Sequence, residues 1–130
     1  GQGVIASFLS KIINNQPIEI WGDGSITRDY IFVDDVIDAI ISCIEDDGAH
    51  KIFNIGRGKG TSLNKIIQLI ETTIGVKVQK KLKPGRKVDV KTNILDCTLA
   101  YEQLKWHHKI SLADGLKLTH EWMNNHEKNI

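Results

Sequence analysis

The sequence has 130 residues, 41% hydrophobic and 25% charged, which is the composition of one globular domain. Its 17 basic and 16 acidic residues are interspersed, and the net charge of +1 argues against nonspecific binding to nucleic acid or anionic lipid. No apolar run approaches the roughly 20 residues of a membrane-spanning helix. The two cysteines, Cys43 and Cys97, fit neither a disulfide framework nor a zinc spacing, so we expect free thiols and a cytoplasmic protein.

The first predicted element is a helix over residues 4–13, where apolar side chains recur at three- and four-residue steps. Residues 18–21 and 30–33 are short runs rich in β-forming residues, and we expect strands there. Between them lies a turn with Gly22 and Gly24. Because glycine has no Cβ, a ligand or a second chain segment can approach this turn closely.

A second helix is predicted over residues 34–46. Asp34 or Asp35 is expected to cap it, since either carboxylate can accept hydrogen bonds from the free backbone N–H groups of the first turn. The apolar face of this helix is very wide, so it needs covering on more than one side. Residues 51–55 follow as an expected buried strand.

A glycine-rich loop at residues 56–60 leads into a helix that Ser62 caps and Gly75 ends. Strand, glycines and helix N-terminus in that order are typical of phosphate sites, because free N–H groups and the helix dipole attract anions. The spacing, however, matches neither the P-loop nor the dinucleotide fingerprint. We therefore prefer a tight turn to a phosphate contact.

Residues 76–80 are predicted to form a short exposed strand, and residues 80–87 a basic loop. Two helices close the chain, over residues 98–104 and from Ser111 onward, where Asp114 three residues later resembles a capping box. The alternation of strands and helices predicts an α/β domain.

Three charged residues are candidates for ligand binding. Arg28 stands at the mouth of a predicted strand, where a guanidinium can donate two parallel hydrogen bonds to a phosphate or carboxylate. Spacing alone favours the alternative, an ion pair with Asp29 or Asp34. Arg86 and Asp89 lie in a loop that can present a cation to a phosphate and a carboxylate to a sugar diol, or simply two charges to solvent.

Four stretches occur in a distinctive order: IEIWGDGSITRDYIFVDDV (18–36), FNIGRG (53–58), RKVDVKTNILD (86–96) and SLADGLKLTHEW (111–122). This order resembles the C-terminal part of extended short-chain dehydrogenases, specifically nucleotide-sugar epimerases and dehydratases and, among them, the UDP-glucose 4-epimerase group. The likeness covers essentially the whole chain. It implies the small α/β substrate-binding lobe of that family without its Rossmann half, so that residues 1–130 would be a portion of a longer chain.

The resemblance also implies a base pocket for a UDP-sugar. Glu19, Ile20 and Trp21 match the residues whose backbone and side chains line that pocket, with Trp21 near the uracil. For Trp21, plain core packing is an equally good interpretation.

The diphosphate and ribose contacts follow from the same resemblance. Arg28 and Arg86 are expected to bind the diphosphate from opposite sides, which suits two guanidinium groups facing roughly two negative charges. Asp89 is expected to receive the ribose hydroxyls. Asn93 matches a position that contacts the substrate in only some members of the family.

The chemistry of the family lies upstream of the matching region. Its NAD-binding glycine fingerprint and its catalytic Tyr-x-x-x-Lys pair are not matched here; Tyr101 and Lys105 have that spacing but fall in a helix that corresponds to another part of the family. We therefore expect no catalytic, cofactor-binding or metal-binding residue in this chain, which alone would be inactive, with NAD bound only by the full-length enzyme.

Several alternatives remain open on sequence. The full-length reaction can be that of an epimerase, or of a 4,6-dehydratase, a decarboxylase or a reductase of the same family. A non-catalytic module that binds a nucleotide sugar is the competing class. The wide apolar face of helix 34–46 would promote self-association if exposed, so we expect a homodimer or a self-associating fragment.

Overall fold

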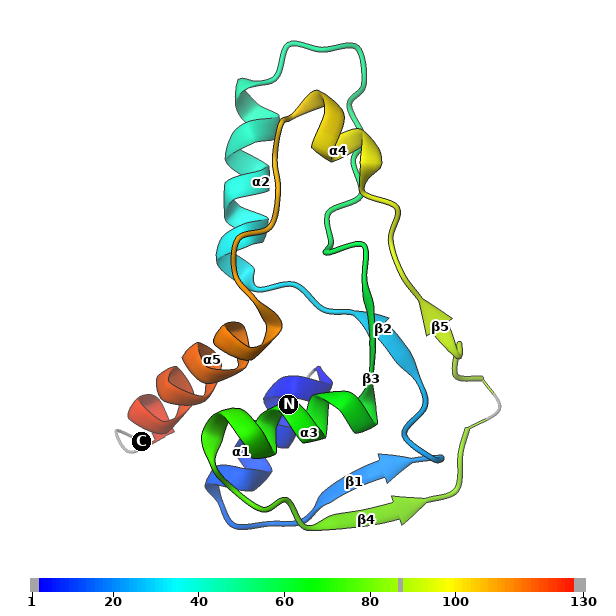
Figure 1. Ribbon diagram of the computed structural model, residues 1–130, viewed down its shortest axis with the longest axis vertical. Helices are drawn as coiled ribbons and strands as arrows, with labels where there is room; N and C mark the ends of the chain where they lie inside the picture. The colour runs from blue at the N-terminus through cyan, green and yellow to red at the C-terminus, as the bar shows by residue number, and fades with distance from the viewer. Residues whose placement is uncertain (1–2, 87, 128–130) are drawn as a thin grey trace.

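The computed structural model describes residues 3–86 and 88–127 and has a mixed α/β fold (Figure 1). In chain order the elements are α1 (Val4–Ile13), β1 (Ile18–Trp21), β2 (Thr27–Asp29), α2 (Val33–Glu45), β3 (Gly60–Ser62), α3 (Leu63–Ile74), β4 (Lys80–Lys83), β5 (Thr92–Asn93), α4 (Thr98–Gln103) and α5 (Leu112–Glu127). No helix in these two ranges has both the length and the apolarity needed to cross a membrane.

The strands form two small sheets. β1 and β4 pair in parallel, with Trp21 opposite Lys83. In the second sheet β2 is central, antiparallel to β3 and parallel to β5, so that Arg28 lies between Thr61 and Asn93. Each sheet is therefore built from segments far apart in the sequence.

The main core lies in the lower half of Figure 1, where α1, α3 and α5 pack together against β1. Its buried members are Phe8, Leu9, Ile18, Ile20, Ile66, Ile67, Ile70, Val78 and Leu116. A smaller cluster of Ala39, Ala100 and Trp106 joins α2 to α4 and the segment that follows α4. The five predicted helices are confirmed, because their apolar periodicity corresponds to faces that pack on these two cores.

Several predicted helix ends are also confirmed. The Ser62 hydroxyl accepts a hydrogen bond from the backbone N–H of Lys65 at 3.2 Å, and Gly75 ends α3 with a φ of +75°. At the start of α5, the N–H of Asp114 donates to the Ser111 hydroxyl at 3.1 Å. These local signals work because they satisfy backbone groups that the helix leaves free.

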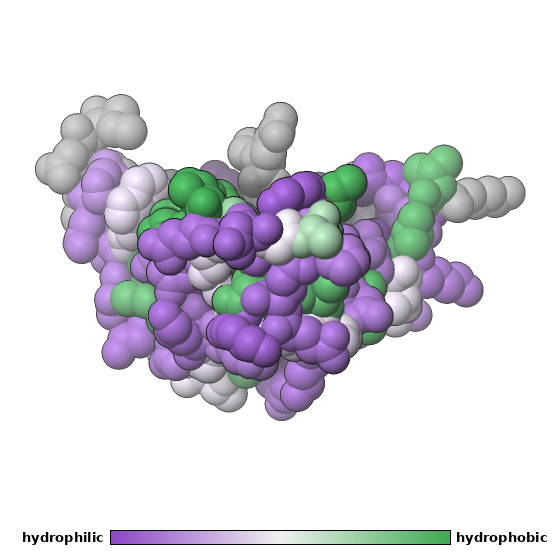
Figure 2. Space-filling view, turned by 90° about the horizontal axis from the view of Figure 1, so that it is seen from above, coloured by the Kyte–Doolittle hydropathy of each residue, from purple (hydrophilic) through white to green (hydrophobic). Residues whose placement is uncertain are grey.

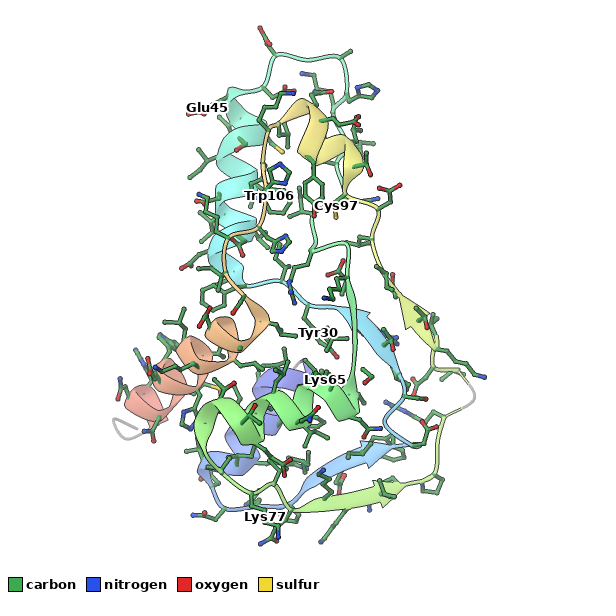
Figure 3. All side chains as sticks on the ribbon, in the orientation of Figure 1. Tyr30, Glu45, Lys65, Lys77, Cys97 and Trp106 are labelled. Carbon is green, nitrogen blue, oxygen red and sulfur yellow. The ribbon has the colours of Figure 1, made fainter. Side chains whose placement is uncertain are left out.

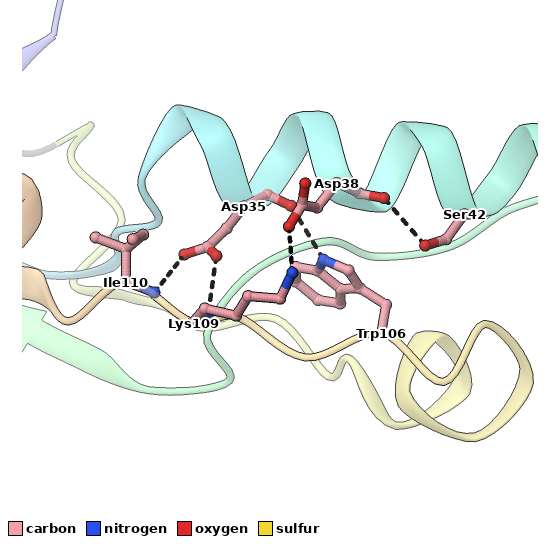
Figure 4. A network of polar contacts seen from close by, with 6 residues as sticks. All are labelled: Asp35, Asp38, Ser42, Trp106, Lys109 and Ile110. Atoms are coloured by element: carbon pink, nitrogen blue, oxygen red, sulfur yellow. Dashed lines mark hydrogen bonds and ion pairs between the residues drawn. The ribbon is translucent and has the colours of Figure 1, made fainter.

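The predicted cap of α2 is wrong. The helix begins at Val33 after Phe32, and no side chain caps it. Asp35 is instead buried against the segment after α4, where its carboxylate accepts hydrogen bonds from the N–H groups of Lys109 at 2.8 Å and Ile110 at 3.1 Å (Figure 4). The Asp35 carboxylate therefore binds backbone groups far along the chain instead of the N–H groups of its own helix.

Three predicted strands are shifted or absent. Residues 51–55 pair with no strand in the described parts of the chain, and their apolar composition alone does not supply one. β2 lies at Thr27–Asp29, before the predicted 30–33, because its backbone partners are β3 and β5. β4 lies at Lys80–Lys83 rather than 76–80, so half of the predicted basic loop is a strand paired to β1.

One face of α2 is left uncovered. Its exposed large apolar residues are Val33, Ile37, Ile40, Ile41 and Ile44. Apolar side chains also reach the surface among polar ones at the end of the molecule that carries α2 and α4 (Figure 2). We expected the apolar face of this helix to be covered on more than one side. In the structure α2 packs on the smaller core through Ala39, and its other apolar side chains remain exposed.

Candidate functional site

A cleft of about 200 Å³ opens between α1, β1, β2, the start of α3 and the loop after β4. Its lining residues are Val4, Phe8, Glu19, Trp21, Ile26, Arg28, Tyr30, Leu63, Arg86 and Asp89. Five of the sequence-predicted site residues are therefore brought together, although they come from three separate stretches of the chain.

β1 supplies one wall of the cleft by strand alternation. Ile18 and Ile20 point into the core and are fully buried, whereas Glu19 and Trp21 point into the cleft. Trp21 remains 40% exposed, so its indole is available to a ligand. The carboxylate of Glu19 lies 3.6 Å from the ammonium of Lys83 on β4. Ile20, the third residue expected in the base pocket, is not among the residues that line the cleft.

The backbone of β1 also presents hydrogen-bonding groups. The N–H of Ile18 donates to Gln79 and that of Gly22 to Lys83, each at 2.9 Å, so alternate residues of β1 face β4. Glu19 and Trp21 accordingly direct their N–H and C=O groups to the other edge. Within residues 3–86 and 88–127 no strand pairs with that edge.

Arg28 reaches the cleft from β2 and is half-buried. Its Nη1 donates to the backbone oxygen of Thr27 at 2.8 Å, and in the described part of the chain it forms no ion pair. The ion pair with Asp29 or Asp34 that spacing favoured is thus absent. The cation of Arg28 is free to meet an anion in the cleft.

Arg86 and Asp89 reach the cleft from the loop after β4, beside Trp21. The Arg86 Nε lies 3.4 Å from the Asp89 Oδ2, and the Arg86 Cζ lies 5.0 Å from the centroid of the Trp21 ring, a cation–π contact. Gly22 has a φ of +83°, which favours glycine, and it lies in ordinary contact with Gly85, since a Cβ on Gly85 would be 3.4 Å from the Cα of Gly22. The glycine turn thus accommodates a second chain segment, as its composition predicted.

Asn93 lies outside the cleft. It pairs with Arg28 across the β2–β5 ladder, and its side chain is exposed. The structure therefore puts Asn93 beside the strand of Arg28 without adding it to the lining.

Tyr30 is the most informative residue that sequence reasoning missed. It lies near the centre of the molecule (Figure 3), and its hydroxyl is buried without a hydrogen-bond partner among the described residues. Burial raises the pKa of this phenol, with the nearby Arg28 guanidinium acting in the opposite direction. Its place two residues after Arg28 is the one available sequence signal, although β2 ends at Asp29 and Tyr30 lies just beyond the strand.

The glycine-rich loop at residues 56–60 bends at Gly56 and Gly58 and runs into β3, so it is not the tight strand-to-helix turn that we expected. Its backbone N–H groups are already used: the Asp29 carboxylate accepts from Arg57 at 3.0 Å and from Gly58 at 2.9 Å. An internal carboxylate thus occupies the place that an external anion takes in phosphate-binding loops.

Other chemistry-bearing groups form no second centre. In the described ranges, His, Cys, Asp and Glu side chains make no cluster able to hold a metal ion, and Cys43 and Cys97 are free. α4 ends at Gln103, and Lys105 beyond it has a φ of +53°, so the helical spacing that would pair it with Tyr101 is broken. A larger apolar cleft of about 320 Å³ lies between α1, the segment after β2 and the start of α5.

Comparison with known proteins agrees with this architecture. Residues 1–56 match the model of the NAD dependent epimerase/dehydratase family. The chain is similar to the C-terminal part of extended short-chain dehydrogenases of this family, as the order of its motifs predicted.

Individual relatives are nucleotide-sugar enzymes. The chain is 37% identical to UDP-glucose 4-epimerase of Mycolicibacterium smegmatis over 95% of its own length and 39% of that protein. It is 40% identical to dTDP-4-dehydro-6-deoxyglucose reductase of Escherichia coli, over 88% of its length and 36% of that protein. The crystal structure of UDP-glucose 4-epimerase from Thermotoga maritima with UDP-glucose superposes with a TM-score of 0.89 at 41% identity, covering 96% of this chain and 40% of that one. The chain thus spans about 40% of the length of these relatives.

Proposed function

We propose that this chain is the nucleotide-sugar-binding C-terminal portion of an NAD-dependent epimerase of the UDP-glucose 4-epimerase type. Its ligand is a UDP-sugar, and the chain is inactive without a Rossmann domain that binds NAD and supplies the catalytic residues. The observation that carries the proposal is the convergence of Glu19, Trp21, Arg28, Arg86 and Asp89 on one cleft. These are the residue types that a base, a diphosphate and a ribose require.

The base is assigned to the free edge of β1. Uracil carries an imide N–H between two carbonyl groups, and the backbone N–H and C=O groups of Glu19 and Trp21 offer complementary partners. The partly exposed indole of Trp21 gives the heterocycle an aromatic surface to pack on. In this assignment the backbone of β1 recognises the base and Trp21 adds stacking.

The diphosphate is assigned to the two arginines. Arg28 has no ion-pair partner in the described ranges, and Arg86, which lines the same cleft, contacts Trp21 and Asp89. Each guanidinium group can donate two hydrogen bonds to phosphate oxygens, which fixes the orientation of the ligand and neutralises its charge. Asp89 is left to accept hydrogen bonds from the ribose hydroxyls.

The hydride chemistry is assigned to residues outside the sequence in hand. Neither a G-x-G-x-x-G fingerprint nor a helical Tyr-x-x-x-Lys pair is present in these 130 residues. In a longer chain, NAD bound by the Rossmann half would accept and return the hydride, while this portion holds the nucleotide.

We further propose that the isolated chain self-associates, as a homodimer or larger assembly, through the uncovered face of α2. Ile44 on that face is 78% exposed, and burial of such a patch is favourable in water.

Calorimetric titration tests the binding role. We expect weak, millimolar-range binding of UDP and UDP-glucose to this chain, because part of the sugar pocket is missing, and no binding of NAD. The double variant Arg28→Ala, Arg86→Ala should lose the UDP signal, while Arg57→Ala, a guanidinium outside the cleft, should retain it. Tight NAD binding would contradict the proposal.

A second reaction has specific support. The Escherichia coli reductase is as similar to this chain as the epimerases are, at 40% identity. A reductase, dehydratase or decarboxylase would use the same nucleotide cleft, as would a non-catalytic binding module. Turnover assays of the full-length protein on UDP-glucose and on a 4-keto nucleotide sugar separate these possibilities.

A further inference from the structure

Asp29 joins three segments of the chain through its carboxylate. Oδ1 accepts a hydrogen bond from the N–H of Arg57 at 3.0 Å, and Oδ2 accepts from Gly58 at 2.9 Å and from Leu95 at 3.5 Å. In the described parts of the chain no cation forms an ion pair with it. The partners of Asp29 are therefore backbone groups, whose positions it fixes.

These contacts act where the strand ladders stop. β5 pairs with β2 only as far as Asn93 opposite Arg28, and β3 begins at Gly60 opposite Asp29. Beyond these ladders the Asp29 carboxylate binds Leu95, which follows β5, and residues 57–58, which precede β3. Both neighbouring segments are thus fastened to β2 at the residue directly after Arg28.

The loop is built around this carboxylate. A Cβ on Gly56 would lie 2.7 Å from the Asp29 Oδ2 and 3.2 Å from its Cγ, which leaves no room for another residue type without displacing Asp29. Gly58 has a φ of +65°, a conformation that favours glycine, and its N–H is one of those bonded to the carboxylate. The glycines at 56 and 58 thus leave the space and the backbone conformation that these contacts with Asp29 need.

We infer that Asp29 is a positioning residue of the diphosphate site. It holds the strand of Arg28 against the segment that runs back from Leu95 to Asp89 and Arg86, so that both arginines face one cleft. The inference rests on the proposed function, because it concerns the geometry of that same cleft. It assigns to Asp29 no contact with the ligand.

The sign of the effect on affinity separates this role from two others. Removing a negative charge near an anion site strengthens anion binding if only the electrostatic field matters. If Asp29 serves only the stability of the fold, the affinity of the folded protein stays unchanged. A positioning role predicts weaker binding despite the more favourable charge, because small misplacements of binding groups are expensive.

The test is a UDP titration of the ¹⁵N-labelled chain followed by NMR, with thermal unfolding measured in parallel. Asp29→Asn should raise the Kd for UDP by about tenfold. Gly56→Ala, which keeps the charge but displaces the carboxylate, should raise it in the same direction. Asp35→Asn is the matched control: it too removes a carboxylate bonded to backbone N–H groups, those of Lys109 and Ile110, but away from the cleft, so it should lower the Tm and leave the Kd unchanged.

Each outcome is decisive. An unchanged or lower Kd in both Asp29→Asn and Gly56→Ala, with the wild-type chain binding UDP, overturns the positioning role and leaves the proposed function standing. If Asp29→Asn does not fold, Gly56→Ala decides alone, and failure of both to fold assigns Asp29 to stability only. Absence of UDP shifts in the wild-type chain overturns the proposed site and this inference with it.

Discussion

The guanidinium of Arg86 lies over the indole ring of Trp21, 5.0 Å from its centroid, while Asp89 holds the same guanidinium from the side at 3.4 Å. This contact links β1 to the loop after β4, and both residues line the cleft. It also means that Arg86 is already oriented before any ligand arrives, which lowers the entropy lost on binding.

Substitution of Trp21 tests the base contact. Trp21→Ala should weaken UDP binding by roughly tenfold, since stacking of a base on an aromatic side chain contributes about 1–3 kcal/mol. Trp21→Phe should retain most of the affinity. Fluorescence or NMR titration with UDP measures both, and an affinity for inorganic pyrophosphate that falls as much as that for UDP would contradict the assignment of Trp21 to the base.

Replacing Arg86 by lysine separates geometry from charge. Lysine keeps the positive charge but can neither fork onto two phosphate oxygens nor stack as a plane on Trp21. Arg86→Lys should therefore lose most of the UDP affinity that Arg86→Ala loses. The same UDP titration measures it, and full retention of affinity by the lysine variant would show that charge alone suffices.

The buried carboxylate of Asp35 should dominate the stability of the upper half of the molecule. It is 2% exposed and accepts two backbone hydrogen bonds, while its own backbone oxygen accepts one from the Trp106 indole at 3.0 Å (Figure 4). Asp35→Ala should lower the free energy of unfolding in urea by about 2–4 kcal/mol, because buried donors lose their acceptor. Lys109→Ala, which removes an exposed ion pair to Asp38, should have a much smaller effect.

Stability should fall in acid partly through Asp96. The hydroxyl and N–H of Thr98 donate to its carboxylate, which lowers its pKa from 3.8. A carboxyl whose pKa is depressed in the folded state stabilises the protein above its unfolded pKa and loses that contribution as the pH falls through the folded pKa. Urea unfolding at pH 5 and pH 3 should show a smaller drop for Asp96→Asn than for the wild-type chain; an equal drop would contradict this.

Because one face of α2 is uncovered, we expect the apparent molecular mass of the isolated chain in solution to rise with its concentration. Ile40→Lys with Ile44→Lys should shift the isolated chain toward a monomer in light scattering, because the substitutions place charges on the apolar patch. Ile52→Lys is the control, since Ile52 is more exposed than either residue but lies in the segment before the glycine-rich loop. A monomeric wild-type chain at high concentration would exclude self-association through α2.

Local signals predicted the helices and missed most strand positions for physical reasons. Helical periodicity and caps such as Ser62 depend on residues three or four apart, whereas β4 is set by its partner β1 and residues 51–55 lack a partner in the described ranges. Asp35 was mistaken for a cap because its true partners, Lys109 and Ile110, lie 74 and 75 residues away.

The convergence of candidate site residues on one cleft was predictable where motif order indicated it. Arg28, Arg86 and Asp89 do line one cleft, whereas spacing alone favoured an ion pair for Arg28 that is absent among the described residues. The link from Asp29 to Arg57 and Gly58 could not be predicted, because it depends on two distant segments meeting after the chain has folded.

The most direct test of the central claim is a map of the backbone amides that shift when UDP is added to the ¹⁵N-labelled chain. The account predicts shifts concentrated at Glu19, Trp21, Arg28 and Asp89, and their loss in the Arg28→Ala, Arg86→Ala double variant. Shifts concentrated instead at the apolar cleft beside α5, or UDP binding that survives the double substitution, would contradict it.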